Sequence, residues 1–145
     1  MEVILYALGK IIAYCVLCYL GVRLFKPTAG HPVAICIALG LLRFGLGLLF
    51  ALPIYIVSNQ VYGQVSAAQA GEALTYIAVY VPVRWVEWSI MALLVVAGSR
   101  SPAGFLLGAD GRDRLWRAVG IVTSCAADIP LMLWVGGLPI GRFFC

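Results

Sequence analysis

The chain has 145 residues, of which 63% are hydrophobic and only 11% are charged, and its mean hydropathy is +1.03. A soluble globular domain carries about 25% charged residues, so this composition excludes a water-soluble fold and indicates an integral membrane protein. The formal net charge of +4 does not indicate a nucleic-acid-binding protein, because the basic residues are divided among separate connections instead of gathering on one face.

Four apolar segments are long enough to cross a bilayer, which takes about 20 helical residues. They cover approximately residues 3–24, 33–57, 74–97 and 115–138. We therefore predict an all-α, polytopic membrane protein in which residues 1–145 form one domain, a bundle of four transmembrane helices. The first segment is longer than a signal-peptide core of about 7–15 residues and contains Lys10, so we expect it to be a helix of the mature protein.

The distribution of Lys and Arg predicts the orientation of the bundle. Arg23 and Lys26 lie in the first connection, and Arg112 and Arg114 lie in the third, whereas the second connection, residues 58–73, contains neither Lys nor Arg. Short loops rich in Lys and Arg stay in the cytoplasm. We therefore predict that both termini lie on the outer side of a plasma, or inner, membrane.

Polar residues follow one face of the first segment. Tyr6, Lys10, Tyr14 and Cys18 recur at intervals of four, so we expect this face to point into the bundle. Lys10 has two interpretations, because it either turns inward or extends along its own stem to the membrane interface. Cys15 and Cys18 form a C-x-x-C pair, but they lie deep within the segment, and we interpret them as packing groups.

The second segment places one arginine between glycines. Gly40, Arg43 and Gly47 share a helix face, which leaves room for a neighbouring helix or for the guanidinium itself. Arginine keeps its charge in lipid, so Arg43 needs a carboxylate, a set of carbonyls or a bound anion. We expect Pro53 to bend the outer end of this helix, and residues 58–73 to form an external loop.

The third segment carries both signs of charge near its middle. Arg84 and Glu87 are three residues apart and can pair within the helix. Pro82 has no N–H and displaces the carbonyl four residues earlier, so a free backbone oxygen is expected about one turn away. Trp85 and Trp88 flank the charges; stacking on a guanidinium is one interpretation, and contact with lipid is the more common one.

The fourth segment carries Asp128, with Ser124 on the same helix face and Pro130 two residues later. We expect Pro130 to loosen the backbone beside this carboxylate. In the connection that precedes this segment, residues 105–107 are apolar but too few to cross a bilayer. We expect them to lie at the cytoplasmic interface.

We predict that the intramembrane charges of all four segments gather in one site, because an ionised side chain in lipid needs a partner. The predicted ligand-binding residues are Lys10, Arg43, Tyr80, Arg84, Glu87 and Asp128. The charged members sum to a surplus of one positive charge. The sequence identifies no catalytic residue and no cofactor, and the only histidine, His31, has no neighbouring Cys, Asp or Glu, so we predict no metal.

Three functions are compatible with such a site. The favoured one is transport or binding of an anionic or amphiphilic small molecule, and a pathway built from only four helices would be expected to need a homodimer. The second is an enzyme embedded in the membrane that acts on a lipid or isoprenoid phosphate, with Glu87 or Asp128 as general acid or base. The third is a structural role, in which Arg43 pairs with Asp128 or Glu87 and Arg84 takes the other carboxylate.

Overall fold

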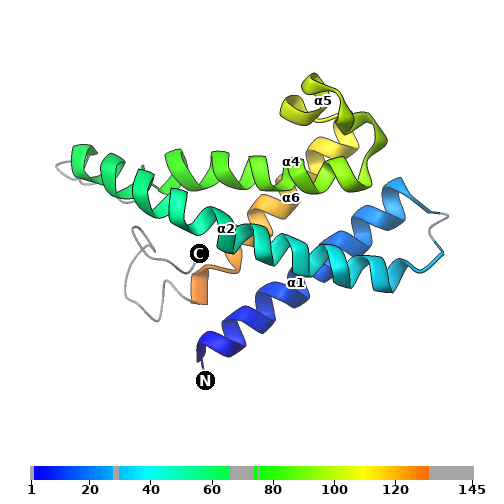
Figure 1. Ribbon diagram of the computed structural model, residues 1–145, viewed down its shortest axis with the longest axis horizontal. Coiled ribbons are helices and arrows are strands. Elements are labelled where there is room, and N and C mark those ends of the chain that lie inside the picture. Colours follow the sequence, from blue (N-terminus) through cyan, green and yellow to red (C-terminus); the bar gives the residue numbers. More distant parts are fainter. Residues whose placement is uncertain (1, 28–29, 66–73, 75, 131–145) are drawn as a thin grey trace.

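The computed structural model describes residues 2–27, 30–65, 74 and 76–130, which are mostly helical (Figure 1). No β-strand occurs within these ranges, so the all-α prediction is confirmed for them. The helices are α1 (Glu2–Phe25), α2 (Pro32–Val65), the π-helix η1 (Tyr76–Tyr80), α4 (Val81–Val95), the 3-10 helix η2 (Ala97–Arg100), α5 (Pro102–Leu107) and α6 (Gly111–Ala126).

Three of the helical stretches are long and apolar enough to cross a membrane: Ile4–Phe25, Pro32–Val61 and Tyr76–Val95. They correspond to the first three predicted spans and support the assignment as a membrane protein. Of the fourth predicted span, 115–138, the part beyond Pro130 lies outside the described residues. The count of four spans and the orientation of the termini therefore stay predictions.

The second helix is longer than its predicted span. α2 continues to Val65, so the prediction that an external loop starts at residue 58 is wrong for its first half; residues 66–73 lie outside the described residues. Pro53 does not end α2, because one proline removes only one backbone hydrogen bond. Ser58 Oγ and Asn59 Nδ2 both donate to the carbonyl of Tyr55, at 3.2 and 2.9 Å, and keep these polar side chains on the helix.

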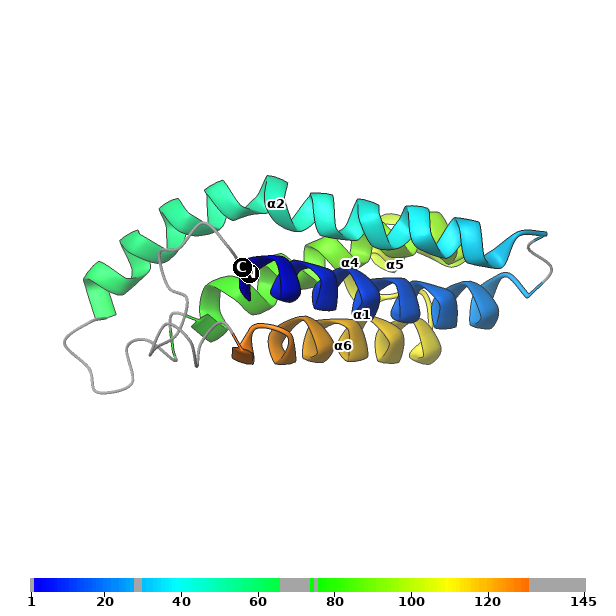
Figure 2. The ribbon, with the colours of Figure 1, turned by 90° about the horizontal axis from the view of Figure 1, so that it is seen from below.

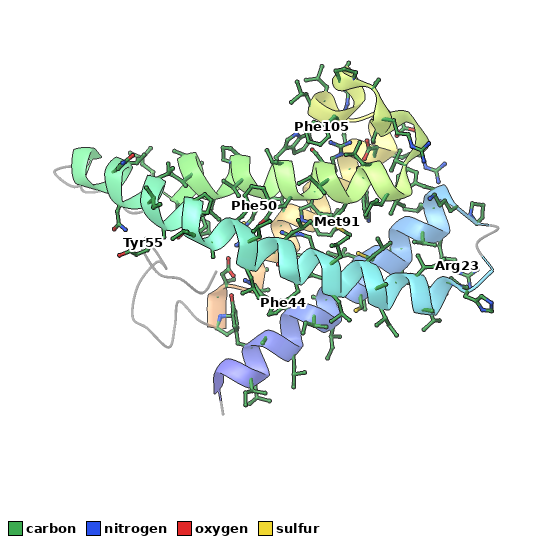
Figure 3. All side chains as sticks on the ribbon, in the orientation of Figure 1. Arg23, Phe44, Phe50, Tyr55, Met91 and Phe105 are labelled. Carbon is green, nitrogen blue, oxygen red and sulfur yellow. The ribbon has the colours of Figure 1, made fainter. Side chains whose placement is uncertain are left out.

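The helices form a layered bundle. Figure 2 shows the bowed α2 on one side and α6 on the opposite side, with α1 and α4 between them. Figure 3 shows Met91 of α4 in the interior, with Arg23 and Tyr55 toward opposite ends. At the Arg23 end, Lys26 Nζ donates to the carbonyl of Leu94 at 2.7 Å, which joins the ends of α1 and α4. The first and third connections therefore lie at the same end of the bundle.

Two tryptophans pack against glycines at the centre of the bundle. A Cβ on Gly120 would lie 2.3 Å from the ring of Trp88, and one on Gly21 would lie 2.6 Å from the ring of Trp116. The two rings meet edge to face with centroids 5.2 Å apart. Trp88 is fully buried, so the interpretation of this ring as a lipid-facing group is wrong. Because Gly120 has no side chain, the Trp88 ring of α4 can pack directly against α6.

The third connection folds into two short helices that end at specific residues. Ser101 Oγ accepts from the N–H of Gly104 at 3.0 Å and caps α5, and Gly108 ends it with a φ of 81°, a conformation that favours glycine. Asp110 Oδ1 then accepts from the N–H of Asp113 at 2.8 Å and starts α6. Leu106 and Leu107 remain 61% and 64% exposed, as expected for a segment at a membrane interface.

Candidate functional site

Asp128 lies where α6 ends. The helix stops at Ala126 because Pro130 has no N–H for the carbonyl of that residue, and Ala127 and Asp128 form a turn. The N–H of Asp128 donates instead to the carbonyl of Cys125, at 3.0 Å. This turn directs a fully buried carboxylate toward α1, η1 and α4.

Both oxygens of Asp128 are held by two donors each. Oδ1 lies 2.6 Å from Lys10 Nζ and accepts from the Tyr6 hydroxyl at 2.9 Å. Oδ2 accepts from Arg84 Nη2 and from the Tyr76 hydroxyl, the latter at 3.2 Å. An ionised carboxylate has about four lone-pair sites. The acceptor capacity of Asp128 is therefore filled by side chains from three other helices.

A second ion pair joins α2 to α4. Arg43 Nη2 lies 2.6 Å from Glu87 Oε2, and both side chains are buried. The guanidinium carbon of Arg43 lies 4.8 Å from the ring centroid of Tyr14 and 5.4 Å from that of Trp88. Aromatic rings at these distances attract the cation and exclude water from the pair. Trp88 therefore lies beside a guanidinium, which was the less common of the two interpretations of this tryptophan.

Arg84 and Glu87 pair with other helices rather than with each other. The sequence spacing allowed an ion pair within α4, but in the structure Arg84 pairs with Asp128 and Glu87 pairs with Arg43. The preceding π-helix η1 ends at Tyr80, two residues before Pro82, and the missing N–H of this proline interrupts the regular backbone pattern. This widened turn places Tyr76 against Asp128.

The structure joins the predicted charged residues in two groups, Arg43 with Glu87, and Lys10 and Arg84 with Asp128; α4 contributes one residue to each group. We call Lys10, Arg43, Arg84, Glu87 and Asp128 the charged cluster; all five are at most 4% exposed. Lys10 turns inward to Asp128, so the alternative in which it extends to the interface is wrong. Tyr80 is also buried, and its ring stacks on the ring of Tyr76 with centroids 4.7 Å apart. Tyr80 thereby helps to hold Tyr76, whose hydroxyl donates to Asp128.

The charged cluster contains more positive charge and more donors than its carboxylates can satisfy. Lys10, Arg43 and Arg84 face only two carboxylates, which leaves a formal surplus of one positive charge. Among the described residues, Arg43 Nε, Arg43 Nη1 and Arg84 Nε are buried and have no hydrogen-bond partner. Unpartnered buried donors are rare in folded proteins and call for an explanation.

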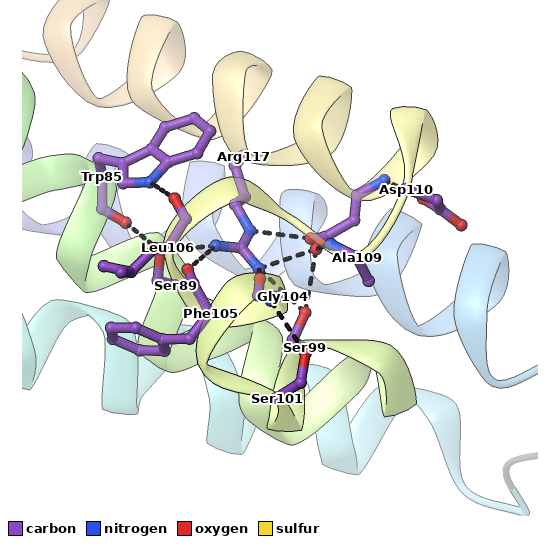
Figure 4. A network of polar contacts seen from close by, with 11 residues as sticks. Trp85, Ser89, Ser99, Ser101, Gly104, Phe105, Leu106, Ala109, Asp110 and Arg117 are labelled. Carbon is purple, nitrogen blue, oxygen red and sulfur yellow. Dashed lines mark hydrogen bonds and ion pairs between the residues drawn. The ribbon is translucent and has the colours of Figure 1, made fainter.

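A further buried network, which the sequence analysis did not identify, surrounds Arg117 of α6 (Figure 4). Its guanidinium donates to both carboxylate oxygens of Asp113, at 2.9 and 2.8 Å, and to the hydroxyls of Ser89 and Ser99 at 2.6 and 2.9 Å. It also donates to the carbonyls of Gly104 and Phe105, at 2.9 and 2.6 Å. Arg117 thereby joins α4, η2 and α5 to α6.

The carboxylate of Asp113 is held in its ionised form. Burial by itself raises its pKa, but the hydrogen bonds from Arg117, the N–H of Ala109 and the hydroxyl of Ser99 outweigh burial and lower the pKa below its usual value. The four-residue spacing of Asp113 and Arg117 is the one sequence signal for this network. Its remaining acceptors are carbonyls of α5 and serines of α4 and η2, which have no recognisable spacing.

Within the described residues, no group of three or more His, Cys, Asp or Glu side chains is placed to hold a metal ion. The described cysteines, including Cys15 and Cys18, are free thiols. The described contacts of the charged cluster are ion pairs, hydrogen bonds and contacts between cations and aromatic rings. No protein-family model, curated protein or solved structure matches this chain.

Proposed function

We propose that this protein binds a small anion, or the anionic headgroup of an amphiphilic molecule, at the charged cluster, as a membrane binding or transport protein. The observation that carries the proposal is the surplus of cationic groups together with the unpartnered nitrogens of Arg43 and Arg84. A bound anion would supply both the missing charge and the missing acceptors.

The energetic argument follows from burial. Each unsatisfied buried donor costs about 1–3 kcal/mol, so the three nitrogens together cost about 3–9 kcal/mol. Asp128 offers no further acceptor, because its four partners occupy its lone-pair sites. An acid oxygen from outside the chain would remove part of this cost, and it would be favoured most where water is excluded.

The backbone beside the cluster supports a transport role for the same site. The π-helix η1 precedes Arg84, and the turn at Asp128 interrupts the path of α6. Interrupted helices near charged groups are typical of substrate sites in secondary transporters. Homodimerisation, which a pathway of few helices would need, stays part of this proposal.

A structural role is the second candidate, and the completeness of the ion pairs favours it. Each carboxylate of the charged cluster is paired with a cation from a different helix, so the cluster also holds α1, α2 and α4 to the end of α6. The enzyme alternative receives less support. A carboxylate with four donors around it, as at Asp128, is poorly placed to take up a proton from a substrate.

Ligand binding to the purified protein in a neutral detergent separates these functions. The probes are sodium acetate, inorganic phosphate, sodium oleate and dodecyl phosphate, and binding is followed by tryptophan fluorescence, since Trp88 lies beside Arg43. We expect at least one probe to bind, and Arg43→Lys to weaken it about tenfold or more, because a charged hydrogen bond contributes about 1.5–3 kcal/mol. Arg43→Lys keeps a cation opposite Glu87, and Arg100→Lys, at an exposed arginine, is the matched control.

The outcomes are distinct. Saturable binding of a probe that Arg43→Lys weakens and Arg100→Lys leaves unchanged supports the proposal, and flux of that probe into liposomes then assigns transport. If no acidic probe binds the wild-type protein while Arg43→Gln lowers its resistance to unfolding, the charged cluster is structural and the proposal is wrong.

A further inference from the structure

Every exposed charged side chain that the structure describes lies at one end of the bundle, where the first and third connections meet. The set contains five cations and one carboxylate: Arg23, Lys26, Arg100, Arg112, Arg114 and Asp110. Five positive charges against one negative charge leave a surplus of four, and the Asp110 carboxylate already accepts from the N–H of Asp113. A surface with charge of one sign attracts a partner of the opposite sign.

Two of these cations lie against the last turns of α1 and α4. Lys26 Nζ donates to the carbonyl of Leu94, at 2.7 Å. Arg112 Nη2 donates to the carbonyl of Leu24, at 3.5 Å, and the guanidinium carbon of Arg112 lies 6.0 Å from the ring centroid of Phe25. Lys26 directly follows Phe25 in the chain. The two cations therefore lie at the same end of α1, although they are far apart in sequence.

Lys26 and Arg112 keep donors that these carbonyls do not use. An ammonium group has three N–H donors and a guanidinium has five, and one hydrogen bond is described for each side chain. The carbonyls at a helix C-terminus carry partial negative charge and hold the cations in place. Both side chains are exposed, so their remaining donors can be reached from outside the bundle, unlike the buried nitrogens of the charged cluster.

The surface beside these two cations is apolar. Leu24 is 46% exposed and Leu94 is 45% exposed, so each cation is bonded to the backbone of a leucine whose side chain faces outward. Leu106 and Leu107 of the third connection are exposed as well. A soluble anionic partner would leave these leucines in water, whereas a lipid offers an acid headgroup and hydrocarbon together. A second copy of this chain would bring the same positive surplus against the first, which is unfavourable.

We propose that this end of the bundle binds an acidic phospholipid of the adjacent leaflet, with the headgroup phosphate between Lys26 and Arg112 and the acyl chains along Leu24 and Leu94. Charged donors bind phosphate oxygens more strongly than neutral donors do. An acidic headgroup is specified because its net negative charge is attracted by the surplus of cations, and each Lys or Arg near an anionic surface strengthens binding about fivefold. This lipid site is separate from the charged cluster and does not depend on the ligand proposed there.

Native mass spectrometry of the protein in a neutral detergent tests the lipid site. Dioleoyl phosphatidylglycerol and dioleoyl phosphatidylcholine, which have the same acyl chains, are added in turn, and the affinity for the first bound lipid is measured. We expect the wild type to bind the phosphatidylglycerol about fivefold or more tightly than the phosphatidylcholine. Lys26→Gln combined with Arg112→Gln should reduce this preference to less than about twofold.

The matched control removes the same charge from the same end of the bundle. Arg100→Gln combined with Arg114→Gln deletes two exposed cations, neither of which is hydrogen-bonded to α1 or α4 in the described part of the chain. This control should keep a preference of about threefold or more. Lys26→Arg combined with Arg112→Lys keeps both charges and should also keep the preference. Circular dichroism shows whether each variant is folded.

The opposing results are distinct. Equal affinity of the wild type for the two lipids would overturn the proposal. If both glutamine pairs lose the preference equally, the surplus charge attracts lipid without a site at Lys26 and Arg112. If soluble glycerol 3-phosphate removes the preference, the occupant is a free phosphate compound and not a lipid. Arg43→Lys should leave the preference unchanged, and its loss in this variant would place the lipid at the charged cluster instead.

Discussion

Replacing Arg117 with methionine removes the centre of the network that joins α6 to the third connection. Asp113 is then left as a fully buried carboxylate that keeps only the donors from Ala109 and Ser99. Removing one partner of a buried ion pair costs about 3–5 kcal/mol. We therefore expect Arg117→Met to raise the equilibrium constant for unfolding by about two to four powers of ten, at about 1.4 kcal/mol for each.

The assay is unfolding of the purified protein by SDS in mixed micelles, followed by circular dichroism. The matched control is Arg114→Met, an exposed arginine on the same helix, which we expect to change stability by about 0.5 kcal/mol or less. Asp113→Leu combined with Arg117→Met should recover part of the loss, because no unpaired charge remains. Equal stability of Arg117→Met and Arg114→Met would refute the reasoning that the network is buried and closed.

Two more predictions concern the same bundle. Because the pKa of Asp113 is lowered in the folded protein, its ionised form adds stability above the usual carboxyl pKa of about 3.9, and this stability is lost as the pH falls below that value. In SDS unfolding between pH 7 and pH 3, Asp113→Asn should therefore lose less stability on acidification than the wild type, and equal losses for the two proteins would contradict this. Gly120→Ala brings a Cβ to 2.3 Å from the ring of Trp88 and should cost about 1–3 kcal/mol, whereas Gly9→Ala, with no described atom within 4 Å, should cost nothing; a melt in which both variants unfold together would count against the packing described.

The inward faces of the helices could be predicted because helical spacing and the cost of charge in lipid act locally. The interval of four along α1 places Lys10, Tyr14 and Cys18 on one face, and all three are buried, whereas Ile12 is exposed. The same reasoning predicted that Arg43 and Asp128 point into the bundle, and both are fully buried. The direction in which each of these side chains points depends on its position along its own helix and on the surrounding lipid, so the local sequence is enough to predict it.

The partners of the charges could not be predicted, because they depend on how the helices pack. Arg84 and Glu87 are spaced to pair with each other, yet each reaches a different helix. The place of Trp88 likewise depends on Gly120, which lies on α6. Arg117 depends most on tertiary structure, because several of its acceptors are in the third connection, in an order that has no periodicity.

The central claim is that a buried cluster with surplus positive charge holds an acid group beside Arg43. An experimental density map of the protein purified from membranes into nanodiscs, at a resolution that shows side chains, tests it most directly. Our account predicts Arg43 paired with Glu87, Arg84 paired with Asp128, and ligand density within hydrogen-bond distance of an unpartnered nitrogen of Arg43 or Arg84. A map in which Arg43 and Asp128 face the surrounding acyl chains, apart from Glu87 and Arg84, would contradict the cluster itself.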